Sequence, residues 1–188
     1  MLQSWRIAKA AAFLPKQARV LDIGSADGAL FQQVDGLAPG CIGIDPTLQH
    51  DVDEKNYRLI AGEFPRDMPS VPSFDAITML AVLEHFPEAA YQDLIEGCRV
   101  FLKPGGRLII TVPSPAVDYV LKVLLTLRLA DTMSIEQHHG YEVERTAEIF
   151  GPPGFHLLHY HRFQLGLNHL FVFERAGASN FTSQLGKR

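Results

Sequence analysis

The sequence predicts an α/β fold: a doubly wound, mostly parallel sheet with helices on both faces. Short apolar, β-rich runs alternate with helical stretches through the first two thirds of the chain. Such alternation is typical of parallel strands joined by crossover helices. Two later runs, Phe155–Arg162 and His169–Arg175, are separated by only a short joint. Because a parallel return needs a dozen or more residues, this pair is expected to be antiparallel, which makes the sheet mixed at one edge.

Five short apolar runs in the first part of the chain have the composition of buried strands. In chain order they are Val20–Ile23, Cys41–Asp45, Tyr57–Ala61, Phe74–Leu80 and Arg107–Val112. The stretches around them predict helices at Gly28–Leu37 and Glu88–Leu102, and an N-terminal helix that Pro15 ends. The segment Lys103-Pro104-Gly105-Gly106 stops the longest of these helices, because proline lacks an amide donor and glycine favours a helix end.

The composition predicts a single domain with a substantial core. The chain has 188 residues, of which 47% are hydrophobic and 20% charged. We expect one domain over residues 1–175 and a flexible, small-residue tail over 176–188. The net charge of −4 argues against a general nucleic-acid binder, which is usually basic. Cys41 and Cys98 lie in apolar stretches and make no disulfide framework, so a reducing, cytoplasmic location is expected.

After Pro115 the pattern predicts a helical cap insertion over residues 116–150, which includes a short helix at Tyr141–Phe150. The stretch Val117–Ala130 is apolar nearly all round, so it needs a surface to cover. We expect a cap over the substrate pocket; packing on the flank of the sheet, a homodimer contact through residues 117–130 and an interfacial membrane surface are the alternatives. The run is shorter than a spanning helix, so stable membrane insertion is not expected.

The chemistry is expected at the turns that follow the strands, because open α/β sheets bind ligands at the carboxyl ends of their strands. Gly24 and Gly28 flank the turn after the first strand, where glycine lets the backbone approach a ligand. Asp45 ends the second strand, 45 − 22 = 23 residues after Asp22, and an acid at this spacing suits the two hydroxyls of a ribose. An ordinary βα turn and an Asp-Pro turn are the structural alternatives.

The glycine spacing disfavours a nicotinamide oxidoreductase. That fingerprint is G-x-G-x-x-G, whereas the turn here is Gly24-x-Ala26-x-Gly28 and the third glycine of the fingerprint is absent. The expected ligand therefore carries ribose and adenine but no pyrophosphate.

Five segments in order resemble the motifs of class I S-adenosylmethionine-dependent methyltransferases of the small-molecule type. They are VLDIGSADGAL (20–30), GIDP (43–46), IAGEF (60–64), FDAITMLAVLEHF (74–86), whose Leu-Glu-His resembles the fourth motif, and LKPGGRLIITVPSP (102–115). The resemblance implies a seven-stranded Rossmann-like sheet of order 3-2-1-4-5-7-6, with the seventh strand antiparallel. It also implies S-adenosylmethionine as the cofactor and S-adenosylhomocysteine as its product.

The resemblance also implies where the cofactor lies. The first-motif residues would line its methionine and ribose, with Asp22 orienting the loop or a water; Asp45 would take the ribose hydroxyls; and Met79 and Leu80 would pass the sulfonium. The full set of expected cofactor residues is Asp22, Gly24, Ser25, Ala26, Gly28, Asp45, Pro46, Gly62, Glu63, Phe64, Met79 and Leu80. Two positions depart from the family pattern: Ala26 replaces the middle glycine, and Glu63 replaces the usual aspartate beside the adenine. Core packing is the alternative for Phe64.

His85 and His139 are the expected catalytic candidates, as a base or as groups that orient the acceptor. A base is required only if the acceptor must lose a proton, because the sulfonium is already activated. A helix-start hydrogen bond for His85 and a solvated loop for His139 are the alternatives. No metal site is expected: alternation along a strand puts His159 and His161 on one face and His156 on the other.

The sequence therefore predicts methyl transfer to a small-molecule acceptor by in-line displacement. Methylation of nucleic acid is disfavoured, because Leu80-Ala81-Val82-Leu83 stands where such enzymes carry an Asn/Asp-Pro-Pro-Tyr segment. A protein that binds S-adenosylmethionine without transferring its methyl, as a sensor or a partner subunit, is the alternative.

Overall fold

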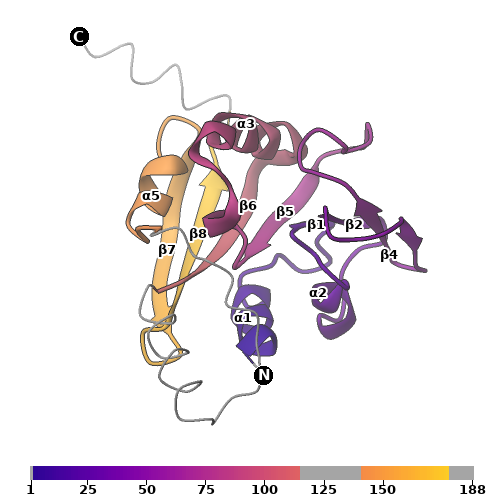
Figure 1. The fold of residues 1–188 in the computed structure, drawn as a ribbon, viewed down its shortest axis with the longest axis horizontal. Coiled ribbons are helices and arrows are strands. Elements are labelled where there is room, and N and C mark those ends of the chain that lie inside the picture. The colour runs from indigo at the N-terminus through magenta and orange to yellow at the C-terminus, as the bar shows by residue number, and fades with distance from the viewer. Residues whose placement is uncertain (1, 115–140, 178–188) are drawn as a thin grey trace.

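A mixed eight-stranded sheet forms the centre of the molecule (Figure 1). The computed structural model describes residues 2–114 and 141–177. The strands are β1 (Val20–Ile23), β2 (Cys41–Asp45), β3 (Val52–Asp53), β4 (Tyr57–Ala61), β5 (Phe74–Leu80), β6 (Leu102–Pro113), β7 (Phe155–Phe163) and β8 (Asn168–Arg175). Their order is β3-β4-β2-β1-β5-β6-β8-β7.

The pairing separates a parallel centre from antiparallel edges. Strands β4, β2, β1, β5 and β6 pair in parallel, whereas β8 runs antiparallel to β6 and β7 antiparallel to β8. The expected antiparallel edge pair is thus confirmed. The sheet has one strand more than the expected seven, because the two-residue β3 adds an antiparallel pairing beside β4. So short a strand has no periodicity that a sequence could show.

The helices are shorter than the sequence predicted. They are α1 (Leu2–Ala11), α2 (Ala29–Gln33), α3 (Tyr91–Phe101) and α5 (Arg145–Ile149), with 3-10 turns η1 (Leu83–His85) and η2 (Glu88–Ala90). Helix α2 ends at Gln33, four residues before the expected Leu37, and Val34 is already extended. The cap helix expected at residues 116–130 and the 117–130 homodimer contact lie outside the described residues. In the described ranges, no helix is long and apolar enough to cross a membrane.

Strands β1 and β2 are buried along their whole length, as is typical of central strands in a parallel sheet. Alternate residues of β1 enter different clusters. Leu21 and Ile23 pack with Leu94 and Cys98 of α3. Val20 instead packs with residues of α1 and α2, which lie beside one another in Figure 1. The same α1 side continues over β6 and β8, where Ala10 packs with Ile109, Leu170 and Val172.

A β-bulge in the edge strand β7 overturns the expected placement of its histidines. Leu157 pairs with Phe173 and His159 with the adjacent Val172, so Leu158 is an extra residue in the ladder. Because His156 pairs with Glu174, two positions from Val172, it shares a face with His159. The prediction that His156 points to the opposite side was therefore wrong: His156, His159 and His161 share one face.

Candidate active site

The loop after β1 is held in an unusual backbone conformation that brings it close to β5. Gly24, Ala26 and Gly28 have φ values of 75°, 44° and 76°, all in the left-handed region. The amide of Gly24 donates to the carbonyl of Ile44 in β2 at 2.9 Å. A Cβ added to Gly24 would lie 2.3 Å from Cγ2 of Val82. The turn after β1 and the segment after β5 therefore pack so closely that position 24 has no room for a side chain.

Replacing Ala26 by glycine is expected to stabilise the fold by about 0.5–1 kcal/mol. An alanine at positive φ is strained by about 1–2 kcal/mol, and the greater backbone freedom of glycine offsets part of the relief. Urea unfolding of Ala26→Gly measures the gain. Ala8→Gly, at an exposed position in the middle of α1, is the matched control and should lose about 1 kcal/mol. Equal losses in both variants would contradict the strain at Ala26.

Asp45 links the end of β2 to the glycine-bearing loop. Its side chain is buried, and its Oδ2 accepts a hydrogen bond of 2.8 Å from the amide of Ala26. Its Oδ1 accepts from the amide of Thr47 at 2.8 Å and from the Thr47 hydroxyl at 2.5 Å. The expected ribose acid thus lies against the loop expected to hold the same cofactor. Thr47 is a positioning residue that the sequence analysis missed, although its place two residues after the acid could have indicated an Asx turn.

Asp22 is a buried carboxyl group on the same side of the molecule. The hydroxyl of Thr78 in β5 donates to its Oδ1 at 2.6 Å. Burial raises the pKa of Asp22 to about 7; the Thr78 hydrogen bond opposes this shift, and the nearby charge of Asp45 adds to it. The carboxyl is therefore near its midpoint at neutral pH. A cationic group placed beside it would favour the ionised form.

Three other expected cofactor residues differ in their exposure and in their contacts. Ser25 is buried, and its side chain would clash with any Cβ added to Gly43 of β2, because the Ser25 Oγ would lie 2.5 Å away. Glu63 is exposed, its carboxylate lies 3.2 Å from Arg66, and its amide donates to Asp67 at 2.8 Å. Phe64 is buried in the main core, 5.9 Å from the ring of Phe101. These contacts favour the core-packing alternative for Phe64.

Two more expected positions also lie at the carboxyl ends of strands. Pro46 directly follows β2, and the amide of Gly62, directly after β4, donates to the carbonyl of Asp45 at 3.2 Å. A Cβ on Gly62 would lie 2.7 Å from Asp67. The loop expected on the adenine side is thus tied by its backbone to Asp45, the expected ribose acid.

The segment after β5 places an exposed histidine beside a cavity. Met79 is fully buried, Leu80 is partly buried, and Ala81 has a φ of 61°. Glu84 is buried and His85 is exposed. A cavity of about 240 Å³ is lined by Glu84, His85, Phe86, Pro87, Glu88, Tyr91, Tyr141 and Arg145. Arg145 pairs with Glu88 at this cavity, and burial raises the pKa of Tyr91 and of Tyr141. His139 lies outside the described residues.

Arg6 is a partly buried cation near Glu84 that the sequence analysis did not single out. Its Nε donates to Oδ1 of Asn168, which opens β8, at 3.0 Å. Burial lowers the pKa of the Arg6 guanidinium overall, although the nearby charge of Glu84 acts in the opposite direction. Within residues 2–114 and 141–177, Arg6 has no ion-pair partner within 4.0 Å. A lone arginine in a helix is a common surface residue, so no pattern in the sequence marked it.

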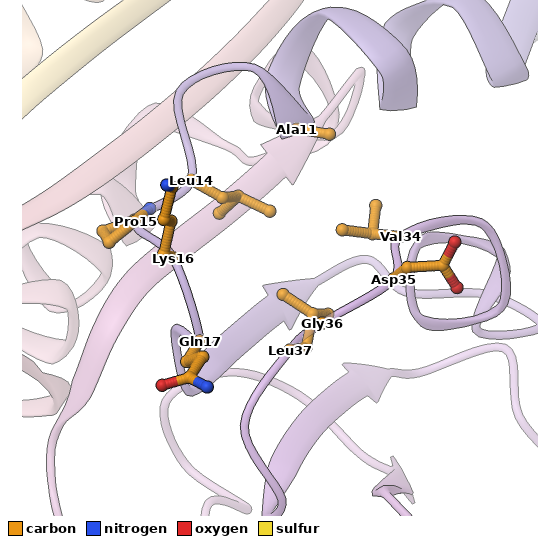
Figure 2. A pocket seen from close by; sticks show the side chains of 9 residues that line it. All are labelled: Ala11, Leu14, Pro15, Lys16, Gln17, Val34, Asp35, Gly36 and Leu37. Atoms are coloured by element: carbon orange, nitrogen blue, oxygen red, sulfur yellow. The ribbon is translucent and has the colours of Figure 1, made fainter.

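A second cavity lies at the amino ends of the strands and is not the expected site. Its volume is about 340 Å³, and its walls are Ala11 and residues 14–17, before β1, and residues 34–37, before β2. Figure 2 shows Leu14 and Val34 pointing toward one another across it, while the carboxylate of Asp35 points away. The residues expected to bind a ligand are all at the opposite, carboxyl edge.

Solved structures share this fold. A methyltransferase of Haloferax volcanii in complex with the Trm112 activator superposes with a TM-score of 0.68 at 16% identity, covering 93% of this chain and 90% of that one. A Burkholderia thailandensis N1-methyltransferase with bound S-adenosylhomocysteine gives 0.66 at 17% identity, covering 93% and 78%. The fold is therefore that of the Rossmann-like methyltransferases.

The chain belongs to the methyltransferase-domain family, whose model matches residues 4–160. A ubiquinone biosynthesis O-methyltransferase of Xanthomonas axonopodis is 30% identical over 148 residues, which are 72% of this chain and 60% of that protein. The chain spans about 60% of the length of the curated relatives it matches.

Proposed function

We propose that this protein binds S-adenosylmethionine at the carboxyl edge of its sheet and transfers the methyl group to a small-molecule acceptor. The observation that carries the proposal is the buried carboxylate of Asp45, held at the end of β2 against the left-handed loop after β1. The family and the S-adenosylhomocysteine bound to a structural neighbour support this cofactor.

Three charged side chains suit the three polar parts of that cofactor. Asp45 would accept hydrogen bonds from the ribose hydroxyls, since a carboxylate accepts at both oxygens. Asp22 would face the ammonium group of the methionine portion. Arg6, a partly buried cation held by Asn168, would donate to its carboxylate. The cofactor would supply an activated methyl on a sulfonium, and the protein would hold the acceptor in line with it.

The cavity beside His85 is the proposed place for the acceptor. It is small, about 240 Å³, and Phe86, Tyr91 and Tyr141 give it aromatic walls. The relatives' name, an O-methyltransferase, supports a hydroxyl acceptor. A hydroxyl group must lose its proton as the new C–O bond forms, and the exposed imidazole of His85 is the base we propose for that proton.

Asp45→Ala is expected to weaken S-adenosylhomocysteine binding by roughly tenfold or more. The variant loses charge-assisted hydrogen bonds to the ribose, each about 1.5–3 kcal/mol, and the tie to the Ala26 amide. Titration calorimetry measures the affinity, with NAD as the ligand control. Asp53→Ala removes an exposed acid of the same charge from β3 and should bind like the wild type. An unchanged affinity in Asp45→Ala would overturn the ribose assignment.

The alternative function, a non-catalytic sensor or partner subunit, makes the same prediction for binding. Methyl transfer separates the two: release of S-adenosylhomocysteine in the presence of a hydroxyl acceptor requires an enzyme. Tight binding with no turnover across an acceptor panel would favour the sensor.

A further inference from the structure

Three histidines, His156, His159 and His161, lie on one face of β7, and the proposed function gives none of them a role. The rings of His159 and His161 have centroids 6.2 Å apart. Both residues are exposed, and β7 is the last strand of the sheet. Because they are two positions apart on a strand, their side chains leave the backbone in the same direction. The pair is therefore a His-x-His element on an accessible edge.

The local packing leaves both imidazoles available as ligands. The ring of Phe13, in the segment after α1, contacts His159 with a centroid distance of 4.8 Å and limits its orientation. In the described part of the chain, neither His159 nor His161 makes a hydrogen bond or an ion pair. Each neutral imidazole offers one nitrogen lone pair, and solvent reaches both rings.

We propose that His159 and His161 together bind a divalent transition-metal ion of borderline softness, such as Cu²⁺, Ni²⁺ or Zn²⁺. A metal lies about 2 Å from an imidazole nitrogen, which puts it about 3 Å from the ring centre. Two rings sharing one metal thus have centroids separated by up to about 6 Å. The observed 6.2 Å is close to that limit, so the two rings must turn toward one another to share a metal at the smaller angles of tetrahedral or square-planar geometry.

The site is open, with water in its remaining positions. No three His, Cys, Asp or Glu side chains converge on a common point in residues 2–114 and 141–177, so no closed structural site is present there. His156 shares the face, but the bulge at Leu158 separates it from the pair, and its cross-strand neighbour is Glu174. Nitrogen ligands of this kind follow the order Cu²⁺ above Ni²⁺ and Zn²⁺, so copper should bind most tightly.

The test is titration calorimetry of the full chain with Ni²⁺ and with Zn²⁺, at a pH above the ordinary range for histidine and in a non-coordinating buffer. Wild type should bind one ion with a micromolar dissociation constant for nickel. His159→Gln and His161→Gln should each weaken that binding at least tenfold, because a single imidazole cannot chelate. His156→Gln is the matched control and should stay within twofold.

Copper paramagnetism gives an independent readout. Substoichiometric Cu²⁺ should broaden the ring proton signals of His159 and His161 in wild type before those of His50, an exposed histidine elsewhere. Nickel binding that is absent at millimolar concentration, or that survives in His159→Gln, would overturn the proposal. An equal loss in His156→Gln would also overturn it. Binding of S-adenosylhomocysteine should be the same in all variants, so the outcome is independent of the proposed function.

Discussion

Gly24→Ala is expected to abolish binding of S-adenosylhomocysteine and to destabilise the fold by about 2–5 kcal/mol. Two costs add up at this position. An alanine at a φ of 75° is strained by about 1–2 kcal/mol. Its Cβ would also lie 2.3 and 2.8 Å from the two γ carbons of Val82, an overlap that costs about 1–3 kcal/mol in a packed interior. Urea unfolding and titration calorimetry measure the two effects.

Two further variants separate these costs. Gly36 has the same φ of 75° with nothing within 4 Å of an added Cβ, so Gly36→Ala should show the backbone strain alone. Val82→Ala removes both γ carbons, so in the Gly24→Ala background it should restore the steric part and leave the strain. A double variant no more stable than Gly24→Ala would show that Val82 is not the obstacle.

Asp22 should lower the stability of the protein by up to about 4 kcal/mol as the pH rises from about 4 to about 7. Burial raises the folded-state pKa of Asp22 from 3.8 to about 7. In this window the native carboxyl keeps its proton while the unfolded chain has lost it, so the native state binds more protons and rising pH favours unfolding. About 3 pKa units at 1.36 kcal/mol each set the upper limit.

Asp22→Asn should remove this pH dependence, because an amide does not ionise there and its oxygen can still accept from Thr78. The measurement is urea unfolding of both proteins at several pH values. Asp75→Asn is the control of opposite sign: burial acts to raise the pKa of Asp75, but hydrogen bonds from Lys103 and the Arg19 amide lower it overall. Asp75→Asn should be less stable than the wild type near neutral pH. This difference in stability should shrink as the pH falls, because the wild-type carboxylate then takes up a proton. If the stability of Asp22→Asn and of the wild type changed in parallel with pH, the raised pKa of Asp22 would be contradicted.

The sequence could predict the turns of the site because short-range chemistry determines them. The left-handed conformation at position 24 favours glycine, so the residue type itself indicates the turn. Asp45 directly ends an apolar run, so the sequence alone places an acid at the end of a strand. The fold class followed from the alternation of strands and helices. The early end of α2 at Gln33 and the two-residue β3 could not be predicted, since tertiary pairing decides them.

The missed features depend on contacts between distant segments. The bulge at Leu158 arises from the register of β7 on β8, and strict alternation of side chains cannot represent an extra residue. Arg6 is held by its hydrogen bond to Asn168, which lies 162 residues further along the chain. The sequence could not decide between a cofactor contact and core packing for Phe64, because an aromatic residue suits both. Its burial in the main core beside Phe101 favours core packing.

The segments at the two ends of the strands differ in how closely they are packed, as the cavity between residues 14–17 and 34–37 shows. All expected ligand-binding positions gather where strands end, whereas Leu14 and Val34 meet where strands begin. The loop at the amino ends has room for change at Gly36, where an added Cβ would meet nothing within 4 Å. Packing at the carboxyl ends is tighter: a Cβ at Gly24 would meet Val82, and a Cβ at Gly43, within β2, would meet both Ser25 and Leu59.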